Sequence, residues 1–585
     1  MSFANWLRSV VADDTREAFA VVDRAAARSR REAEAPQRRA RDEMEQLAGR
    51  PRDTVALGAS LGLDGNPFTV RIREAEMRRG HWFVTGATGS GKSFWAVSAL
   101  LQMLRRRPAG WVVIDLKGEL AKDLREVWIP SLVASLPDDQ ARNLIRRVAV
   151  IAPFDETSVA PFQLLARDPS LSIELQAREV ASSFGHTIGR DLGALQTTIL
   201  NYALMLAIDV GLTLPDLPKL LSDPEILRAA VARSTMPEVQ SYFATRFPRE
   251  KSGSLISLLS RLDTLLMHVH LRKMLSAPGM IRFDRLIEDA VTIIDLGRAP
   301  AGIRELSRFF GSILFQKIVR AVFARRIDDD TPPVTIVADE FQSLLSKEVA
   351  ADFDAILTQA RSQRAFLWML CQQVAQVQAV SGTLLDIIQT NSSCELLFRA
   401  NVNDARALDH IFPIVKNIPR DRVGSADPRV ARPMMSEAEE RRQIVESVPQ
   451  MPDRVAWYWN QRRPYRALLM RSPDVNREGA VRLAATLPAA VREALARGVL
   501  ATPTASTDDR PAPAATAARQ PLTPDSDAPP ASTPSVRADS DETLANDDGG
   551  ADTETVGDES AREQLATTSP APRSRRRRPR TPHLG

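Results

Sequence analysis

Cysteine and histidine are scarce in this sequence. Two Cys and six His occur among 585 residues, too few for a framework of disulfides. Their spacing does not match the ligand pattern of a structural zinc site. We therefore expect Cys371 and Cys394 to be free thiols, and the chain to work in a reducing, cytoplasmic compartment.

Long apolar stretches are also missing. A transmembrane helix needs about 20 mostly apolar residues, and the longest uncharged helical stretch, residues 192–208, is interrupted by Gln196, Thr197, Thr198 and Asn201. This stretch is typical of a core helix, and no membrane span is predicted. The first residues, MSFANWLRSVVADD, become acidic before an apolar region of signal-peptide length can form, so secretion is not expected.

Charge of one sign does not dominate the chain. The 77 Lys and Arg against 73 Asp and Glu leave a net charge of +4, and the length favours more than one domain. From residue 501 onward aromatic and large aliphatic residues become rare, so residues 501–585 are predicted to be a disordered tail. Its Arg-rich end, residues 573–580, is either a solvated basic end or a weak binding site for nucleic acid or an acidic partner.

Residues 1–50 have the pattern of an amphipathic and then highly charged helix. Apolar residues recur at helical spacing near the N-terminus, at Phe3, Trp6, Leu7, Val10 and Val11. This stripe either packs onto the chain's own core or docks on a membrane surface or a membrane-bound partner.

Apolar runs alternate with helical segments between residues 51 and 500. The runs predicted to be buried strands are 81–86, 110–118, 147–154, 290–297, 334–340, 365–373 and 394–400. Continuous apolar strands separated by helices favour an α/β fold with a mostly parallel sheet covered on both faces.

Residues 161–280 are helical throughout, with proline-led helix starts, and predict an all-helical insert. Residues 455–471 are predicted to form a hairpin with a basic turn, and residues 481–500 a C-terminal helix.

The sequence GATGSGKS follows the first of these strands and opens a helix. It fits the phosphate-binding pattern G-x-x-x-x-G-K-[ST] through Gly86, Ala87, Thr88, Gly89, Ser90, Gly91, Lys92 and Ser93. The glycines let backbone N–H groups turn toward the phosphates of ATP, and the lysine supplies a positive charge. The Ser93 hydroxyl is suited to bind Mg²⁺. We expect Lys92 to face solvent when no nucleotide is bound, so that its replacement leaves the fold intact.

Hydrolysis also requires acidic groups near the phosphates. Asp339 and Glu340 end the strand VTIVADE and are suited to hold Mg²⁺ through a water and to polarise the attacking water, respectively. Gln372 ends the next strand, where it can sense the γ-phosphate. Arg361, eleven residues earlier, is either an ordinary surface arginine or a group that reaches the nucleotide of a neighbouring subunit.

With these motifs the chain resembles the HerA/FtsK superfamily of hexameric DNA-pumping ATPases, and most of all the type IV coupling proteins of conjugation and secretion. The resemblance rests on VTGATGSGKS, VVIDLKGEL, VIAPFDETSVAPFQLL, IVADEF and the spacing of the R…Q pair. It implies a RecA-like P-loop domain in residues 51–160 and 281–480 around the insert. It also implies that Asp115 belongs to the nucleotide site, that Lys92 and Glu340 are catalytic, and that Gln372 is the sensor and Arg361 the trans-acting arginine finger.

Two features depart from that family. Coupling proteins commonly carry N-terminal transmembrane helices, which are not predicted here, so any membrane contact is expected to be peripheral and through a partner. A second arginine usually precedes the first strand, where this chain has Gly80 beside Arg78 and Arg79. Three functions stay open: an ATP-driven, sequence-independent DNA translocase acting as a ring, a nucleotide-gated receptor for a relaxase or effector, and a motor partnered with a nuclease.

Overall fold

The computed structural model describes residues 38–61, 67–155, 162–168, 171–185, 192–249, 253–267, 269–276, 281–297, 304–345, 347–413, 436–463 and 467–498. They all belong to one compact unit, Met1–Leu522. The predicted N-terminal apolar stripe and the predicted disordered tail lie outside the described residues. Of the predicted N-terminal helix, residues 38–48 are described and are helical, with Ala40, Met44 and Leu47 buried.

A sheet of eleven strands runs through the described part of the chain, in the order β2-β1-β11-β10-β9-β3-β8-β7-β4-β6-β5. The strands are β1 Thr54–Ser60, β2 Thr69–Arg73, β3 His81–Thr85, β4 Trp111–Asp115, β5 Val148–Ile151, β6 Val291–Asp295, β7 Val334–Asp339, β8 Ala365–Cys371, β9 Ser392–Phe398, β10 Val455–Asn460 and β11 Leu468–Arg471.

The seven strands from β9 to β5 pair in parallel and include all seven strands predicted from apolar runs. This confirms the α/β class and the mostly parallel sheet. The remaining pairings are antiparallel, among them the predicted hairpin, β10 with β11. Strands β1 and β2 were not predicted from the sequence. The run TVALGAS of β1 contains small residues and a glycine and is weakly apolar, and β2, TVRIR, contains two arginines.

Successive residues of the parallel strands point to opposite faces of the sheet, and each face has its own core. On β3, Phe83 packs into one cluster while Trp82 and Val84 pack into the other. In the second cluster the rings of Trp82, Trp95 and Trp368 contact one another, and Trp111 contacts Trp368. Burial on both faces explains why these strands appear in the sequence as continuous apolar runs.

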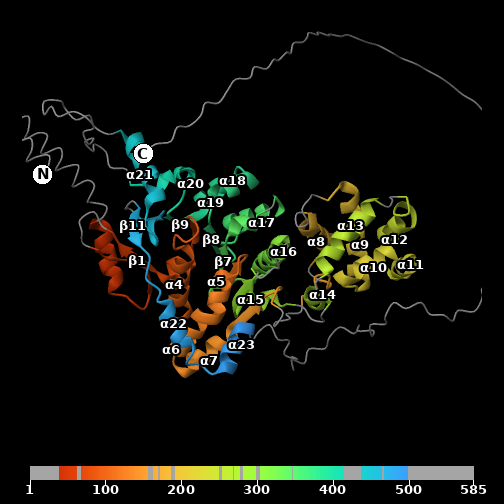
Figure 1. The fold of residues 1–585 in the computed structure, drawn as a ribbon, viewed down its shortest axis with the longest axis horizontal. Coiled ribbons are helices and arrows are strands. Elements are labelled where there is room, and N and C mark those ends of the chain that lie inside the picture. The colour runs from red at the N-terminus through yellow and green to blue at the C-terminus, as the bar shows by residue number, and fades with distance from the viewer. Residues whose placement is uncertain are drawn as a thin grey trace, which may run out of the picture. The chain divides into compact units, whose positions relative to one another are not determined.

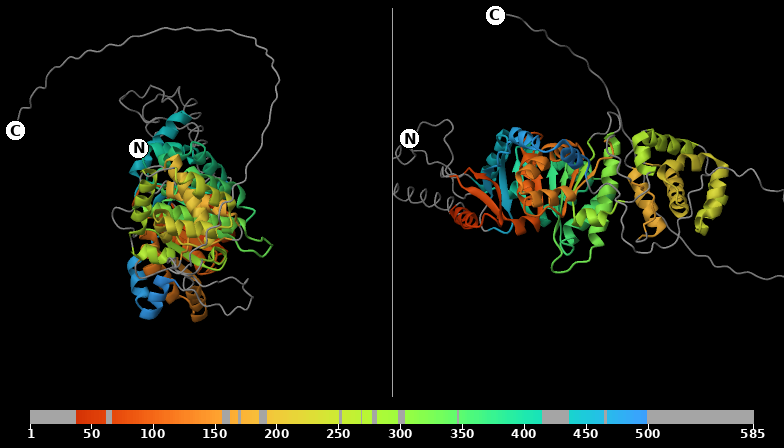
Figure 2. Two further views of the ribbon diagram at one scale, coloured as in Figure 1. Left: turned by 90° about the vertical axis from the view of Figure 1, so that its right-hand side faces the viewer. Right: turned by 90° about the horizontal axis from the view of Figure 1, so that it is seen from below.

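Helices cover both faces of the sheet (Figure 2). Those of the ATPase-like part are α3 Glu74–Arg78, α4 Lys92–Leu104, α5 Glu119–Asp123, α6 Ile129–Ser135, α7 Asp138–Arg147, α15 Phe283–Glu288, α16 Arg304–Phe323, α17 Lys347–Gln359, α18 Val374–Val380, α19 Leu384–Asn391, α20 Val402–Ala407, α21 Glu437–Ser447, α22 Arg477–Ala484 and α23 Ala489–Arg497. Helix α4, which carries the P-loop lysine, packs on the tryptophan side.

The chain between the paired strands β5 and β6 contains a group of helices (Figure 1). They are α8 Ile173–Gly185, α9 Ala194–Val210, α10 Leu217–Ser222, α11 Pro224–Arg233, α12 Pro237–Ser241, α13 Gly253–Leu266 and α14 Val269–Ser276. The proline-led starts occur at α10, α11 and α12, and Asp223 caps α11 by accepting hydrogen bonds from two backbone N–H groups. Helix α9 contains most of the predicted core helix, and its apolar side chains are buried.

The segment predicted as one C-terminal helix is interrupted. Helix α22 ends at Ala484, a turn follows, and α23 begins after Pro488, whose ring suits a helix start better than a helix interior. Among the helices that the structure describes, none is long and apolar enough to cross a membrane.

Candidate nucleotide-binding site

The strand order brings the predicted site residues to one edge of the sheet. Strand β8 lies between β3, which leads into the P-loop, and β7, which ends at Asp339. Thr85 is paired with Cys371, and Leu370 with Asp339. Gly86, Gln372 and Glu340 each follow one of these three neighbouring strands. Their backbones therefore lie side by side at the carboxyl edge, where ligands bind in open parallel sheets.

The P-loop is held by segments distant in the sequence. The Gly86 N–H donates to the Cys371 carbonyl at 3.1 Å, and the Ala87 N–H to the Arg399 carbonyl at 2.7 Å. The Ser90 carbonyl accepts from the Arg454 N–H at 2.7 Å. The loop is thus fixed at its start by β8 and β9 and near its end by the residue that precedes β10.

Glycine is required at Gly91, which has φ +110°. A side chain there would place its Cβ 2.9 Å from the Arg454 Cα, closer than such atoms approach in real structures. Helix α4 begins directly afterwards, at Lys92. The close approach of Arg454 therefore accounts for the last glycine of the motif.

Several backbone N–H groups of the loop and the first turn of α4 are free to bind an anion. Within the part of the chain that the structure describes, the N–H groups of Thr88, Gly89, Gly91, Lys92 and Ser93 donate no hydrogen bond. The Ser90 hydroxyl is buried and without a partner there as well. Free N–H groups at a helix N-terminus suit a phosphate, because the helix dipole adds to their partial positive charge. The loop therefore fits the phosphates of a nucleotide.

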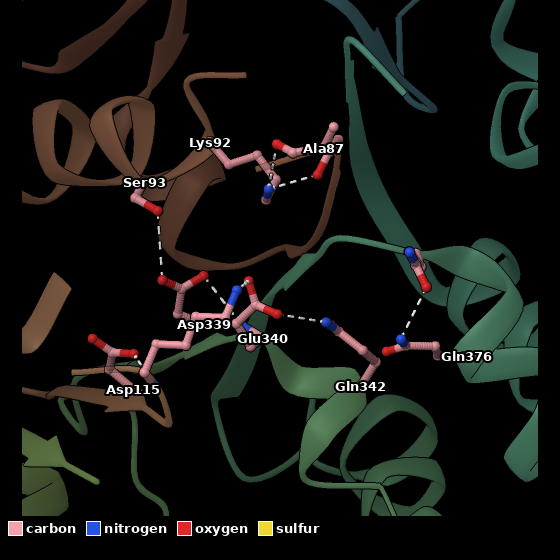
Figure 3. Close-up of polar contacts among 11 residues, drawn as sticks. Ala87, Lys92, Ser93, Asp115, Asp339, Glu340, Gln342 and Gln376 are labelled. Atoms are coloured by element: carbon pink, nitrogen blue, oxygen red, sulfur yellow. Dashed lines mark hydrogen bonds and ion pairs between the residues drawn. The ribbon is translucent and has the colours of Figure 1, made fainter. Parts of the chain in front are cut away.

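Lys92 does not face solvent, so the expectation from the sequence was wrong. Its exposed fraction is 5%, and its Nζ donates to the Gly86 carbonyl at 2.6 Å and to the Ala87 carbonyl at 3.1 Å (Figure 3). The amine is folded back because the loop carbonyls replace the water that burial removes. Burial lowers the pKa of Lys92, while the nearby charges of Asp339 and Glu340 act in the opposite direction.

The two groups predicted to serve Mg²⁺ face each other. The Ser93 Oγ donates to Asp339 Oδ2 at 3.5 Å (Figure 3). Burial, followed by the negative charges of Asp115 and Glu340, raises the pKa of Asp339 to about 7, although Lys92 opposes this rise. A hydroxyl and a carboxylate form the oxygen donor set that Mg²⁺ prefers, so these residues fit the ion.

Glu340 has an unusual backbone conformation and a crowded carboxylate. Its φ is +56°, in the left-handed region that few residues other than glycine adopt. Its Oε1 accepts from Lys117 Nζ at 3.0 Å, and its Oε2 from Gln342 Nε2 at 2.8 Å. Backbone strain of this kind concentrates at functional sites, and here it follows the strand that delivers Asp339.

Asp115 is fully buried next to Asp339 on the neighbouring strand. Its carboxylate accepts hydrogen bonds from the Lys117 N–H and the Ala121 N–H, both at 2.9 Å. Asp115 thus shapes the loop after β4. Gln372 is half-buried at the end of β8, beside the first residue of the P-loop.

Arg361 lies at the opposite end of the sheet. It is exposed and precedes β8, whereas the P-loop lies beyond the last residue of that strand. Burial and then the positive charge of Arg361 lower the pKa of His81, the first residue of β3, to about 4, which places Arg361 near that edge. The arrangement brings Lys92, Ser93, Asp339, Glu340 and Gln372 together and leaves Arg361 outside this group.

Arg78 and Arg79, which lie where the family has a second arginine, differ in their surroundings. Arg78 is buried, donates to the Pro333 carbonyl at 3.0 Å and lies over the Trp111 ring. It is part of the core. Arg79 is exposed before β3, at the same edge as Arg361.

Four residues of the site were not predicted as such: Lys117, Gln342, Arg399 and Arg454. Lys117 stood in the motif VVIDLKGEL, near the end of the predicted strand 110–118, so the meeting of strand ends was a signal for it. The backbone contacts of Arg399 and Arg454 with the P-loop have no signature in the sequence.

No protein-family model and no curated protein matches this sequence. Among solved structures, the chain is similar to VirB4 of Thermoanaerobacter pseudethanolicus, with 14% identity and a TM-score of 0.48 over 73% of this chain and 98% of that one. It is also similar to the bacterial conjugative coupling protein TrwBdeltaN70, with 16% identity and a TM-score of 0.45 over 72% and 90%. TrwB in complex with ADP and Mg²⁺ has 15% identity and a TM-score of 0.46 over 72% and 91%. At such values the function has to be argued from the site itself.

Proposed function

We propose that this chain is a Mg²⁺-dependent P-loop ATPase of the type IV coupling class, which moves DNA through a ring of identical subunits. The observation that carries the proposal is the set of free N–H groups at the start of α4, next to the Lys92 ammonium and opposite Asp339 and Glu340. Phosphate binding and hydrolysis need these groups at one place.

Each residue has a role in the proposed reaction. The loop N–H groups and Lys92 would hold the phosphates of ATP, and Ser93 and Asp339 would hold Mg²⁺, Asp339 through a water. Mg²⁺ supplies positive charge that offsets the charge developing on the phosphate oxygens. Glu340 orients the attacking water. Gln372, at the end of β8, contacts the γ-phosphate and senses its release after hydrolysis.

The position of Arg361 supports a ring. An exposed arginine at the far end of β8 cannot reach the nucleotide of its own subunit, but it can serve the site of a neighbour. Such an arginine stabilises the charge of the transferred phosphoryl group.

DNA binding by the ring is expected to be largely independent of sequence and to weaken with salt, because contacts with the DNA phosphates dominate. The proposed location is the cytoplasm, and any contact with the inner membrane would be peripheral and through a partner protein.

A second candidate is a nucleotide-gated receptor for a relaxase or effector. A groove of about 750 Å³ lies on the helical insert and is lined by residues that include Pro215, Leu259 and Arg272. Ile256 and Met267 on its rim are exposed. An exposed apolar groove of this kind favours protein binding.

ATP hydrolysis by the purified full chain, with and without DNA, separates the two candidates. A translocase is expected to hydrolyse ATP faster with DNA of any sequence, whereas a receptor responds to its protein partner and not to DNA. Glu340→Gln should still bind ATP but hydrolyse it about 10²- to 10⁴-fold more slowly, the usual contribution of a positioned base. Glu446→Gln, a change of an exposed glutamate on α21, is the matched control. Near-normal turnover by Glu340→Gln would exclude the proposed site.

A further inference from the structure

Lys117 is fixed in space by the loop that follows β4. The Asp115 carboxylate accepts from the N–H groups of Lys117 and Ala121, which pins both ends of the loop. Gly118 has φ +79°, and a Cβ there would lie 2.8 Å from Asp295 Oδ1. The backbone of Lys117 therefore has little freedom. Because β4 and β7 are parallel neighbours with Asp115 opposite Asp339, Lys117 is placed beside Glu340.

Within the described part of the chain, each carboxylate oxygen of Glu340 has one hydrogen-bond partner. Lys117 Nζ donates to Oε1 at 3.0 Å. Gln342 Nε2 donates to Oε2 at 2.8 Å (Figure 3). The exposed fractions of the Lys117 and Glu340 side chains are 45% and 7%. A carboxylate oxygen has room for two hydrogen bonds, so each oxygen keeps one acceptor position for a water molecule.

Gln342 leaves a further acceptor at the same place. Its side chain is buried, its Nε2 is committed to Glu340, and its Oε1 has no hydrogen-bond partner within the described part of the chain. A water that attacks phosphorus has two hydrogens to donate. Glu340 and Gln342 Oε1 together offer two acceptors for them.

Resting on the proposed function, we propose that Lys117 and Gln342 are positioning residues for hydrolysis: they hold the Glu340 carboxylate so that it and Gln342 Oε1 orient the attacking water. Lys117 acts through Glu340 and does not bind the nucleotide. An ion pair with a half-exposed lysine contributes little to stability, so its loss should change the rate and leave the fold intact.

The test uses the full-length protein and measures kcat and KM for ATP under the conditions in which the wild type is active. Lys117→Met is expected to lower kcat about tenfold to a hundredfold, part of what a positioned base supplies, and to leave KM within about twofold. Lys117→Arg should recover most of the rate, because it restores the charged donor. Lys122→Met, which removes an exposed lysine of the neighbouring helix α5, should match the wild type. Gln342→Met provides a second variant, with kcat also lowered at unchanged KM.

A double-mutant comparison shows whether Lys117 acts through Glu340. Adding Lys117→Met to Glu340→Gln should slow single-turnover hydrolysis no further, because the group being positioned is already lost. A further multiplicative loss, or a KM effect without a kcat effect, would overturn the inference. If Lys117→Met and Gln342→Met keep the wild-type kcat while Glu340→Gln is inactive, the inference fails and the ATPase proposal stands. If Glu340→Gln is also fully active, the proposed function itself has failed.

Discussion

Lys92 is hydrogen-bonded to its own loop, with Nζ 2.6 Å from the Gly86 carbonyl oxygen. A nucleotide must compete with this contact, since the lysine has to turn from the loop carbonyls to the phosphates. The loop therefore holds the buried positive charge of Lys92 at the place where the phosphates of a nucleotide are expected to bind.

Replacing Lys92 by Ala should abolish hydrolysis, with a loss of at least about 100-fold, because the phosphates lose their nearest positive charge. The free energy of unfolding should change by no more than about 1–2 kcal/mol, since the lost hydrogen bonds and the relieved burial of charge oppose each other. ATPase assays and thermal melts measure the two effects. Lys122→Ala on the surface of α5 is the control, and near-normal turnover in Lys92→Ala would contradict the site.

The raised pKa of Asp339 makes binding and stability depend on pH. Mg²⁺ needs the ionised carboxylate, so with a pKa of about 7 the affinity for Mg²⁺ and ATP together should be about tenfold weaker at pH 6 than at pH 8. Binding near pH 7 should release protons, which calorimetry in buffers of different ionisation enthalpy measures. Asp263→Asn, on the exposed face of α13, should leave this dependence unchanged. An affinity that is flat from pH 6 to 8 would show that Asp339 is ionised throughout.

The stability of the nucleotide-free protein should also depend on the ionisation of Asp339. It should fall as the pH rises, whereas the affinity for Mg²⁺ and ATP should increase. Between the unfolded value of 3.8 and about 7, the folded protein keeps a proton on Asp339 that the unfolded chain has released. This contribution to stability is therefore full below about pH 4 and is lost as the pH rises to about 7. Asp339→Asn should remove that part of the pH slope, as denaturant melts across this range would show.

Gly91→Ala should impair nucleotide binding by at least about tenfold, because the new Cβ collides with the Arg454 Cα and pushes the loop away from β10. Backbone strain alone would cost about 1–2 kcal/mol. Gly211→Ala separates the two effects: Gly211 also has a positive φ, but a Cβ there meets nothing within 4 Å. If both variants bind ATP like the wild type and lose equal stability, the contact of the new Cβ with Arg454 does not affect nucleotide binding and the prediction is wrong.

Arg361→Ala should bind ATP normally but hydrolyse it about 10³- to 10⁵-fold more slowly, the range known for arginine fingers. Strand β8 alone separates Arg361 from its own P-loop by about 20 Å. Mixing Arg361→Ala with Lys92→Ala subunits should restore some turnover, because a mixed interface joins an intact loop to an intact arginine. Arg228→Ala, on the exposed surface of α11, should act like the wild type. A mixture as inactive as its parents, under conditions where wild-type subunits assemble, would leave Arg361 a surface residue.

The predictable part of the molecule is the part encoded by local patterns. Strands buried on both faces appear as apolar runs, and the P-loop glycines and Lys92 occur at fixed spacing, so β3, its loop and β7 were predicted from the sequence. The direction of Lys92 was not, because it depends on loop carbonyls that only the folded backbone brings within reach. The pairing of Lys117 with Glu340 depends on which strands are neighbours, and a strand list does not contain that order.

Strand β3 has a consequence for how the chain is made. Both of its partners, β8 and β9, follow residue 364, and the Arg454 N–H that holds the Ser90 carbonyl comes later still. During synthesis on the ribosome the P-loop thus emerges hundreds of residues before the two strands that pair with β3 and before Arg454. Because pairings between distant segments form late, the nucleotide site is expected to be completed last. A nascent chain released before residue 454 would then carry the whole phosphate-binding motif without being able to hold a nucleotide.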